Sequence, residues 1–169
     1  MKSFRLSRLA ALFGLLALAG CVSDSDRSDA PDRPMDPWVF RSVLDERPRM
    51  VTLALHDNLW VSYSGQTGAL YKAWRGGVNF DGPVYTTVHG PQPTTIGDGW
   101  MENRFPLPWR LLEGDKEWRP RVQYRGHRFE DGHVWLHYEL HHDGHVVHVW
   151  EQPEYAERGA GQVGFVRTF

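Results

Sequence analysis

The sequence predicts a mostly β fold, an antiparallel β-sandwich with one short N-terminal helix. Two observations lead to this prediction. The chain contains eight Trp, six Tyr and eight Phe together with 17 Gly, a composition that favours strands and turns over a helix bundle. From residue 50 onward, short runs of β-branched and aromatic residues are separated by turn residues, a pattern typical of antiparallel strands.

The N-terminal residues carry the features of an export signal. A basic start precedes the apolar run from Ala10 to Leu18, which is too short to span a bilayer, and the run leads into Leu-Ala-Gly-Cys. This pattern resembles a bacterial lipoprotein signal, which implies removal of residues 1–20 and lipidation of Cys21. Val22 after the cysteine is similar to the pattern for outer-membrane sorting. We therefore expect Cys21 to anchor the chain in the bacterial outer membrane.

The cysteine count and the charge exclude several classes of function. Cys21 is the only cysteine, so its lipidation leaves no thiol for a disulfide, a nucleophile or a Cys-based metal site, and the chain has no Cys-x-x-Cys-His haem motif. Three of the 19 Lys and Arg lie in residues 1–20, which hold no acid. Residues 21–169 therefore contain 16 basic and 21 acidic residues, which gives them a formal charge of −5. That balance argues against binding of nucleic acid.

The region after the cysteine divides into a tether and one domain. Residues 21–35 carry acids and prolines with little apolar surface, so we expect a disordered tether, and residues 36–169 suit a single domain. Asp36-Pro37 has the character of a helix start. The apolar residues that follow it fit one face of a short helix that ends before Pro48. They are Val39, Phe40, Val43 and Leu44.

The next part of the domain predicts successive antiparallel strands. Each run is short, rich in β-branched and aromatic residues, and bounded by turn residues. The segment from Thr94 to Pro108 is dense in Gly, Pro and polar residues, so we expect a long loop there. The expected strands are Met50–Leu55, Leu59–Tyr63, Ala69–Trp74 and Val84–His89.

The C-terminal part predicts a three-stranded meander. Asp131-Gly132 and Asp143-Gly144 separate three strand-like runs, and Asp-Gly favours a two-residue type I′ turn because both residues accept positive φ. Gln162–Phe169 also alternates up to the last residue. We therefore expect the fold to be cut short or completed by another segment. The three runs are Val122–Glu130, His133–His141 and His145–Glu151.

Two-residue turns fix the register of the meander by counting. The count places Tyr124 and His148 on either side of Glu139, and Trp150 opposite His137. One face is apolar and predicts the core side: Phe129, Val134, Leu136, Tyr138, Leu140, Val147 and Val149. The other face collects aromatic and ionisable side chains: Tyr124, Arg128, Trp135, His137, Glu139, His141, His148 and Trp150.

This second face has three interpretations. As a carbohydrate site, Trp135 and Trp150 offer flat apolar rings to the C–H groups of a sugar. The polar side chains that would orient the sugar are Arg128, His137, Glu139 and Tyr124. As a divalent metal site, it offers N and O ligands on directly opposed residues, whose Cβ atoms lie about 4.5 to 5.5 Å apart. These ligands are His137, His141, His148 and Glu139. As a sheet surface, it is solvated or covered by another segment.

Four segments of the domain resemble a module of secreted bacterial multidomain proteins. They are Asp36–Asp45, Ala54–Val61, Gly77–Gly82 and Val88–Pro93. In those proteins the module precedes carbohydrate-binding segments and cytochrome c or haem-binding segments. The resemblance implies a carbohydrate or redox setting at the cell envelope. It implies no catalytic residue, and the haem motif of those proteins is absent from this chain.

The expected function is binding, with a carbohydrate as the ligand. A first alternative is an accessory part of a periplasmic redox or sugar-oxidising assembly, which docks a cytochrome-bearing partner through the same face or through Gln162–Phe169. A second alternative is a metal-binding domain, or a hydrolase or lyase that uses Glu139 with His137 or His148.

Overall fold

The computed structural model describes residues 36–57, 59–82, 90–103, 107–159 and 162–169. The fold is mostly β and its sheets are antiparallel, as predicted, and no helix occurs in these ranges. They accordingly contain no helix long and apolar enough to cross a membrane. The predicted anchor at Cys21, the tether and the strand expected at Val84–His89 lie outside the described residues.

The first sheet has five strands in the order β1-β2-β3-β4-β7. The strands expected at Met50–Leu55, Leu59–Tyr63 and Ala69–Trp74 are confirmed as β2, β3 and β4, with boundaries that differ by a few residues. The strands of this sheet are β1 (Trp38–Leu44), β2 (Arg47–His56), β3 (Leu59–Ser64), β4 (Leu70–Trp74) and β7 (Gly99–Glu102).

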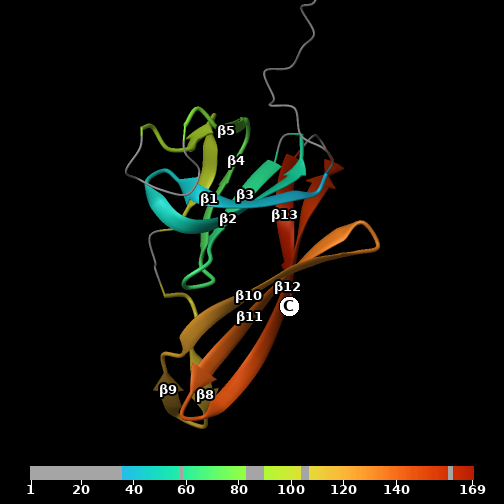
Figure 1. The fold of residues 1–169 in the computed structure, drawn as a ribbon. Coiled ribbons are helices and arrows are strands. Elements are labelled where there is room, and N and C mark those ends of the chain that lie inside the picture. The colour runs from blue at the N-terminus through green and yellow to red at the C-terminus, as the bar shows by residue number, and fades with distance from the viewer. Residues whose placement is uncertain (1–35, 58, 83–89, 104–106, 160–161) are drawn as a thin grey trace, which may run out of the picture.

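The second sheet contains the predicted meander and one more strand, in the order β10-β11-β12-β13. Figure 1 shows that β12 is long: it pairs with β11 low in the view and with β13 high in the view. Both Asp-Gly turns have positive φ at both residues, which confirms the type I′ prediction. The strands are β10 (Arg121–Glu130), β11 (His133–His142), β12 (His145–Arg158) and β13 (Gln162–Thr168).

Two short strand pairs complete the described fold. β5 (Gly77–Asn79) pairs with β6 (Thr94–Ile96), and β8 (Leu111–Glu113) pairs with β9 (Lys116–Trp118). The prediction of one long loop from Thr94 to Pro108 is therefore wrong in part, because β6 and β7 lie within it. These strands have three and four residues and are mostly exposed, so they show no run of buried apolar residues that would reveal them.

The predicted N-terminal helix is wrong, because this segment forms β1. It pairs with β2 through a two-residue turn at Asp45 and Glu46, where φ is 48° and 62°. Val39 packs in the core between the sheets, while Trp38 and Phe40 pack on the other side of the first sheet. An apolar strand that packs on both faces lacks the alternation of a half-buried strand, so its periodicity does not distinguish it from a helix.

Two hydrophobic clusters lie on opposite faces of the first sheet, as the alternation of Val61 and Trp60 along β3 requires. The first cluster joins the two sheets: Val51, Leu53, Leu59, Val61, Tyr63, Leu70, Ala73, Val134, Leu136 and Tyr138. The second is covered in part by β5 and is rich in aromatic rings: Leu44, Met50, Ala54, Trp60, Tyr71, Trp74 and Val78.

The predicted core face of the meander is confirmed in its centre and wrong at its ends. Phe129 and Val147 are 53% and 44% exposed. Figure 1 shows both hairpins of the meander extending past the first sheet, so the first sheet does not cover the ends of these strands. The residues that do face the core are Val134, Leu136, Tyr138 and Leu140, with Val149 packed at the margin.

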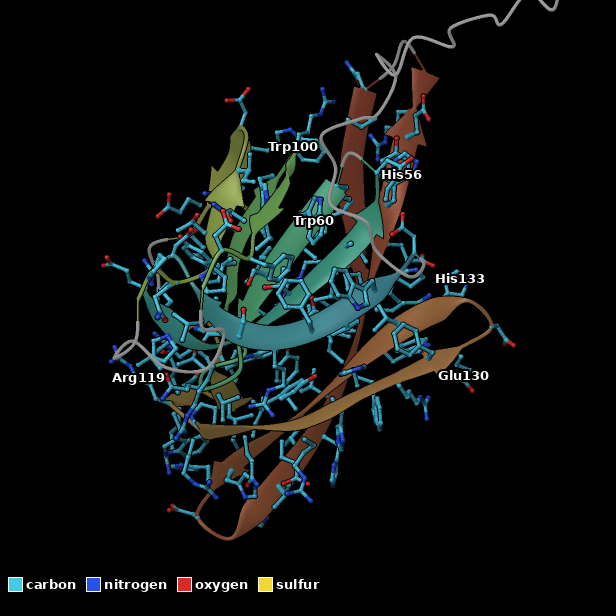
Figure 2. All side chains as sticks on the ribbon, turned by 45° about the horizontal axis from the view of Figure 1, so that its top comes forward. His56, Trp60, Trp100, Arg119, Glu130 and His133 are labelled. Carbon is cyan, nitrogen blue, oxygen red and sulfur yellow. The ribbon has the colours of Figure 1, made fainter. Side chains whose placement is uncertain are left out.

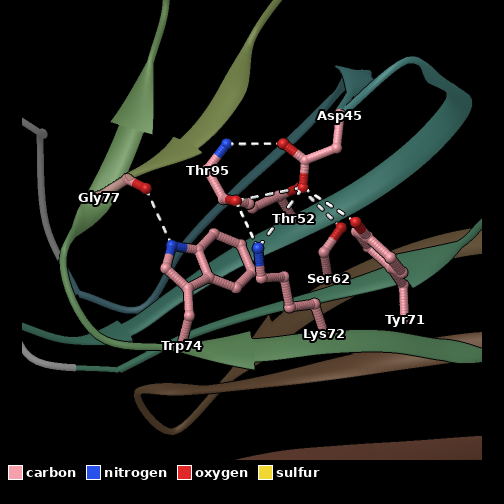
Figure 3. Close-up of polar contacts among 8 residues, drawn as sticks. All are labelled: Asp45, Thr52, Ser62, Tyr71, Lys72, Trp74, Gly77 and Thr95. Atoms are coloured by element: carbon pink, nitrogen blue, oxygen red, sulfur yellow. Dashed lines mark hydrogen bonds and ion pairs between the residues drawn. The ribbon is translucent and has the colours of Figure 1, made fainter. Parts of the chain in front are cut away.

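A polar network fastens the turn after β1 to the short β5–β6 pair (Figure 3). The carboxylate of Asp45 accepts hydrogen bonds from the Thr95 backbone N–H at 2.8 Å and from the Tyr71 hydroxyl at 3.0 Å. Lys72 Nζ lies 3.8 Å from the same carboxylate and donates to Thr95 Oγ1. Asp45 therefore holds β4, β6 and its own turn together, which stabilises a turn whose two residues have positive φ.

Candidate functional site

The candidate site lies on the outer face, which we define as the side of β10–β12 turned away from the first sheet. The predicted register places His137 opposite Trp150, Glu139 opposite His148 and Arg128 opposite Trp135, and the structure confirms all three pairs. The outer face therefore brings together most of the predicted residues: Arg128, Trp135, His137, Glu139, His141, His148 and Trp150.

Tyr124 is the exception, and its predicted place on the outer face is wrong. A β-bulge at Arg125 inserts one extra residue into β10, so Tyr124 pairs with Tyr138 instead of Glu139. The Tyr124 ring lies 5.6 Å from the Tyr138 ring and packs against the core between the sheets. Burial raises the pKa of Tyr124 to about 12. Tyr124 therefore belongs to the inner face.

The same bulge brings a residue that the sequence reasoning missed. Arg125 Nε lies 3.3 Å from Glu139 Oε1, and this ion pair adds a cation to the site. A signal for the bulge was present in the sequence, because Gly126 interrupts an otherwise typical strand and an isolated glycine inside a strand often marks a bulge. Gly126 has a φ of 142°, a backbone conformation that other residues rarely adopt.

Among the described residues, His137, Glu139 and His148 form a cluster of possible metal ligands. His137 Nε2 lies 3.1 Å from His148 Nδ1, and His148 Nδ1 lies 3.9 Å from Glu139 Oε1. One ligand atom from each of the three residues lies within 4.8 Å of the other two. Because β11 and β12 are paired neighbours, the sheet itself sets these distances.

Both carboxylate oxygens of Glu139 have partners. His141 Nε2 lies 3.0 Å from Oε2, on the side away from Arg125 and His148. Burial opposes ionisation of Glu139, but the hydrogen bond from His141 and the charge of Arg125 outweigh it and lower the pKa of the carboxyl group. Glu139 is therefore an anion at neutral pH, and His141 orients it from outside the three-residue cluster.

The two histidine rings of the cluster share a proton. Since His137 Nε2 and His148 Nδ1 are within hydrogen-bond distance, one nitrogen donates and the other accepts. Burial and the neighbouring His148 lower the pKa of His137, although Glu139 acts in the opposite direction. His137 is therefore held in the neutral form, the form in which an imidazole binds a metal ion.

The two tryptophans of the outer face are already in contact with polar neighbours. The Trp150 ring stacks on the His137 ring with centroids 4.1 Å apart and planes 5° apart. The Arg128 guanidinium carbon lies 4.4 Å from the centre of the Trp150 ring and 6.0 Å from that of Trp135. Both rings are half-buried. The stacking surface that a sugar would use is therefore partly occupied by Arg128 and His137.

Ion pairs border the outer face at the tip of the β10–β11 hairpin. Figure 2 shows Glu130 and His133 at this tip. Glu130 Oε2 lies 2.9 Å from Arg128, and His133 Nδ1 lies 2.5 Å from Glu154 Oε1 on β12. Arg128 therefore contacts Glu130 as well as the two tryptophan rings of the outer face.

No family model, curated protein or solved structure matches this chain. The resemblance to the module of secreted multidomain proteins therefore stays a prediction, and so does the cytochrome-bearing partner that it implies. The candidate site rests on its own geometry.

Proposed function

We propose that this protein is a lipid-anchored binding protein of the bacterial envelope, with a β-sandwich domain whose outer face binds one divalent transition-metal ion. Cys21 would attach the chain to the membrane, and His137, Glu139 and His148 would hold the ion. The observation that carries the proposal is the convergence of two imidazole nitrogens and one carboxylate oxygen within 4.8 Å.

The distances within the cluster fit a tetrahedral ion. Two nitrogens bound to zinc at about 2.0 to 2.1 Å in tetrahedral geometry are roughly 3.3 Å apart. His137 Nε2 and His148 Nδ1 lie 3.1 Å apart, close to this separation, so a turn of the two rings would direct both nitrogens at one ion in place of their proton. Glu139 Oε1 at 3.9 Å from His148 Nδ1 completes the set after a small rotation of its side chain.

The chemistry of the donors indicates zinc or copper. Imidazole is a borderline ligand that suits Zn²⁺ and Cu²⁺, whereas Ca²⁺ and Mg²⁺ prefer oxygen ligands alone, so the two imidazoles favour zinc or copper. His141 supports the carboxylate on its second oxygen, as outer partners of metal ligands commonly do. His148 is 56% exposed, so the three protein ligands leave the solvent side of the ion open. An open position would accept water, a small anion or a donor group from another molecule.

Calorimetric titration with Zn²⁺ tests the proposal on the untagged full chain in a neutral, sugar-free detergent. We expect one zinc ion per chain. Glu139→Gln and His148→Gln should each weaken zinc binding at least tenfold, because each removes one of three ligands. His145→Gln is the matched control, since His145 lies on the same strand as His148 but outside the cluster, and it should change the affinity less than twofold. Equal binding by all variants would contradict the proposal.

Carbohydrate binding is a second candidate, favoured by Trp135 and Trp150 on one face with Arg128 beside them. Aromatic rings bordered by hydrogen-bond donors suit a sugar with an apolar side. Because Arg128 and His137 already cover part of the Trp150 ring, a sugar would have to displace Arg128 or bind at the exposed edge of the pair.

A glycan-binding screen tests this second candidate. If the outer face binds a sugar, Trp135→Ala combined with Trp150→Ala should abolish that binding. Trp100→Ala is the control, because Trp100 is also partly exposed but lies on β7 of the first sheet. Glycan binding that survives the double substitution would remove the basis for this candidate.

A further inference from the structure

A polar groove opens between the two sheets, away from the outer face. Its volume is about 360 Å³, within the range of small-molecule sites. β1 and β2 each contribute one arginine, the turn after β3 contributes backbone and an amide side chain, and β10 forms the opposite wall. The lining residues are Arg41, Arg49, Gly65, Gln66, Val122, Gln123 and Tyr124.

The groove carries uncompensated positive charge. Its lining contains two arginines and no acidic residue. Within the ranges that the structure describes, no carboxylate forms an ion pair with Arg41 or Arg49. The Arg41 guanidinium carbon lies 5.6 Å from the centre of the Tyr124 ring, so this side chain lies against the wall of the groove. Both guanidinium groups keep hydrogen-bond donors for a ligand.

The backbone holds Arg49 in an uncommon conformation at the groove. Its φ is 58°, in the left-handed region that residues other than glycine rarely adopt. The Gly65 N–H donates to the Arg49 carbonyl at 2.9 Å, and a Cβ at Gly65 would lie 2.7 Å from that carbonyl. The close approach of Gly65 thus fixes the arginine that borders the groove, and such local strain is often found at binding sites.

We propose that this groove binds the phosphate group of a small phosphate ester through Arg41 and Arg49. A phosphate has up to two negative charges, which match two arginines, and its oxygens point in several directions, which suits donors that come from different strands. Gln66 and Gln123 supply amide donors beside them. The groove exceeds the volume of the phosphate group itself, so it has room for the attached sugar or glycerol.

The test follows the Nε–Hε NMR signals of Arg41 and Arg49 in the full chain, in a neutral detergent with EDTA present. EDTA prevents phosphate from binding through a metal ion, so this result does not depend on the outer-face site. Inorganic phosphate should shift both signals saturably, whereas sodium chloride at equal ionic strength should not. Arg41→Gln combined with Arg49→Gln should weaken binding at least tenfold, because charge-assisted hydrogen bonds are lost. The fold of the double variant is checked by its thermal melt.

Two controls separate this site from general charge and from the metal cluster. Arg158→Gln removes an exposed charge at the far end of β12 and should change phosphate affinity less than twofold, as should Glu139→Gln. Absence of saturable shifts, or equal weakening by Arg158→Gln, would overturn the proposal. Glucose 6-phosphate and glycerol 3-phosphate then distinguish a sugar phosphate from a lipid headgroup. Tighter binding of either ester than of inorganic phosphate supports the groove as the site, and binding of neither ester overturns it.

Discussion

At the scale of single residues, competition for the Glu139 carboxylate governs the candidate metal site. Arg125 and His148 contact Oε1 of this carboxylate, and His141 contacts Oε2. A metal ion would replace the contact with Arg125, whose side chain is 48% exposed and free to turn into solvent. The anionic charge of Glu139 is then available to the ion, while His141 keeps the carboxylate oriented.

The pKa of His137 should respond to its neighbour. Burial and His148 together hold the pKa of His137 below its usual value of about 6.5. His148→Gln removes one of these causes, so the midpoint of the His137 titration should rise toward pH 6.5 without reaching it. Histidine ring signals in NMR, recorded on metal-free protein, measure this midpoint. His142→Gln, on the opposite face of β11, should leave it unchanged. A midpoint that does not rise in His148→Gln would contradict the described contact.

The same shift links pH to stability with a defined sign. Because the pKa of His137 is lower in the folded than in the unfolded chain, the unfolded chain binds the proton more tightly. The contribution of His137 to the free energy of unfolding is therefore fully present above pH 6.5. It decreases as the pH falls below that value. Zinc binding should weaken over the same range, since protons compete for the imidazoles.

At the scale of elements, the bulge in β10 decides which side chains reach the outer face. The two Asp-Gly turns fix the pairing near each turn, so the sequence alone correctly predicted the partners of Arg128, His137 and Glu139 on β11 and β12. Counting fails beyond Arg125, because one inserted residue moves every earlier side chain of β10 to the other face. Tyr124 was misplaced for that reason.

β1 and β7 show two further limits of sequence reasoning. β1 packs against apolar groups on both faces, and such a pattern fits a helix as well as a strand. β7 is exposed along all four residues and joins the sheet through backbone pairing with β4, which leaves little mark on side-chain pattern. The hydrogen bonds of Glu151 on β12 with Tyr63 of β3 and Arg167 of β13 could not be predicted from the sequence either, since they depend on how the two sheets pack.

The bulge should depend on the glycine that follows it. Gly126→Ala places a side chain at φ 142°, and nothing lies within 4 Å of the new Cβ, so the cost is backbone strain of about 1 to 3 kcal/mol. Urea unfolding followed by tryptophan fluorescence measures this loss. Gly164→Ala on β13 is the matched control, because its Cβ also meets nothing and its φ is not positive. That substitution should be neutral or slightly stabilising. Equal stability of the two variants would contradict the bulge.

At the scale of the whole molecule, a buried ionic contact joins the two sheets. Glu151 on β12 is fully buried and accepts a hydrogen bond from the Tyr63 hydroxyl of β3 at 2.7 Å. Arg167 on β13 binds both carboxylate oxygens, at 2.6 and 3.0 Å. Burial and the charge of Glu151 raise the pKa of Tyr63 well above its usual value, so this hydroxyl keeps its proton and donates it to Glu151.

Removal of the buried carboxylate should strongly destabilise the fold. Glu151→Gln leaves Arg167, which is 31% exposed, without its counter-ion, so we expect a loss of about 3 kcal/mol, at the low end for broken buried pairs. Glu154→Gln is the matched control two residues along β12. It breaks an ion pair with His133 that is much more exposed and should cost less than about 1 kcal/mol. Chemical denaturation of both variants measures the loss in free energy of unfolding. Equal losses would contradict the role of Glu151 in joining the two sheets.

The central claim is that one divalent ion binds His137, Glu139 and His148 on the outer face. The most direct measurement is a zinc titration of the full chain followed by the ring-nitrogen NMR signals of its nine histidines. The structure predicts that His137 binds through Nε2 and His148 through Nδ1, and that both signals saturate at one zinc per chain. Saturation at other histidines, or no change in these two, would contradict the claim.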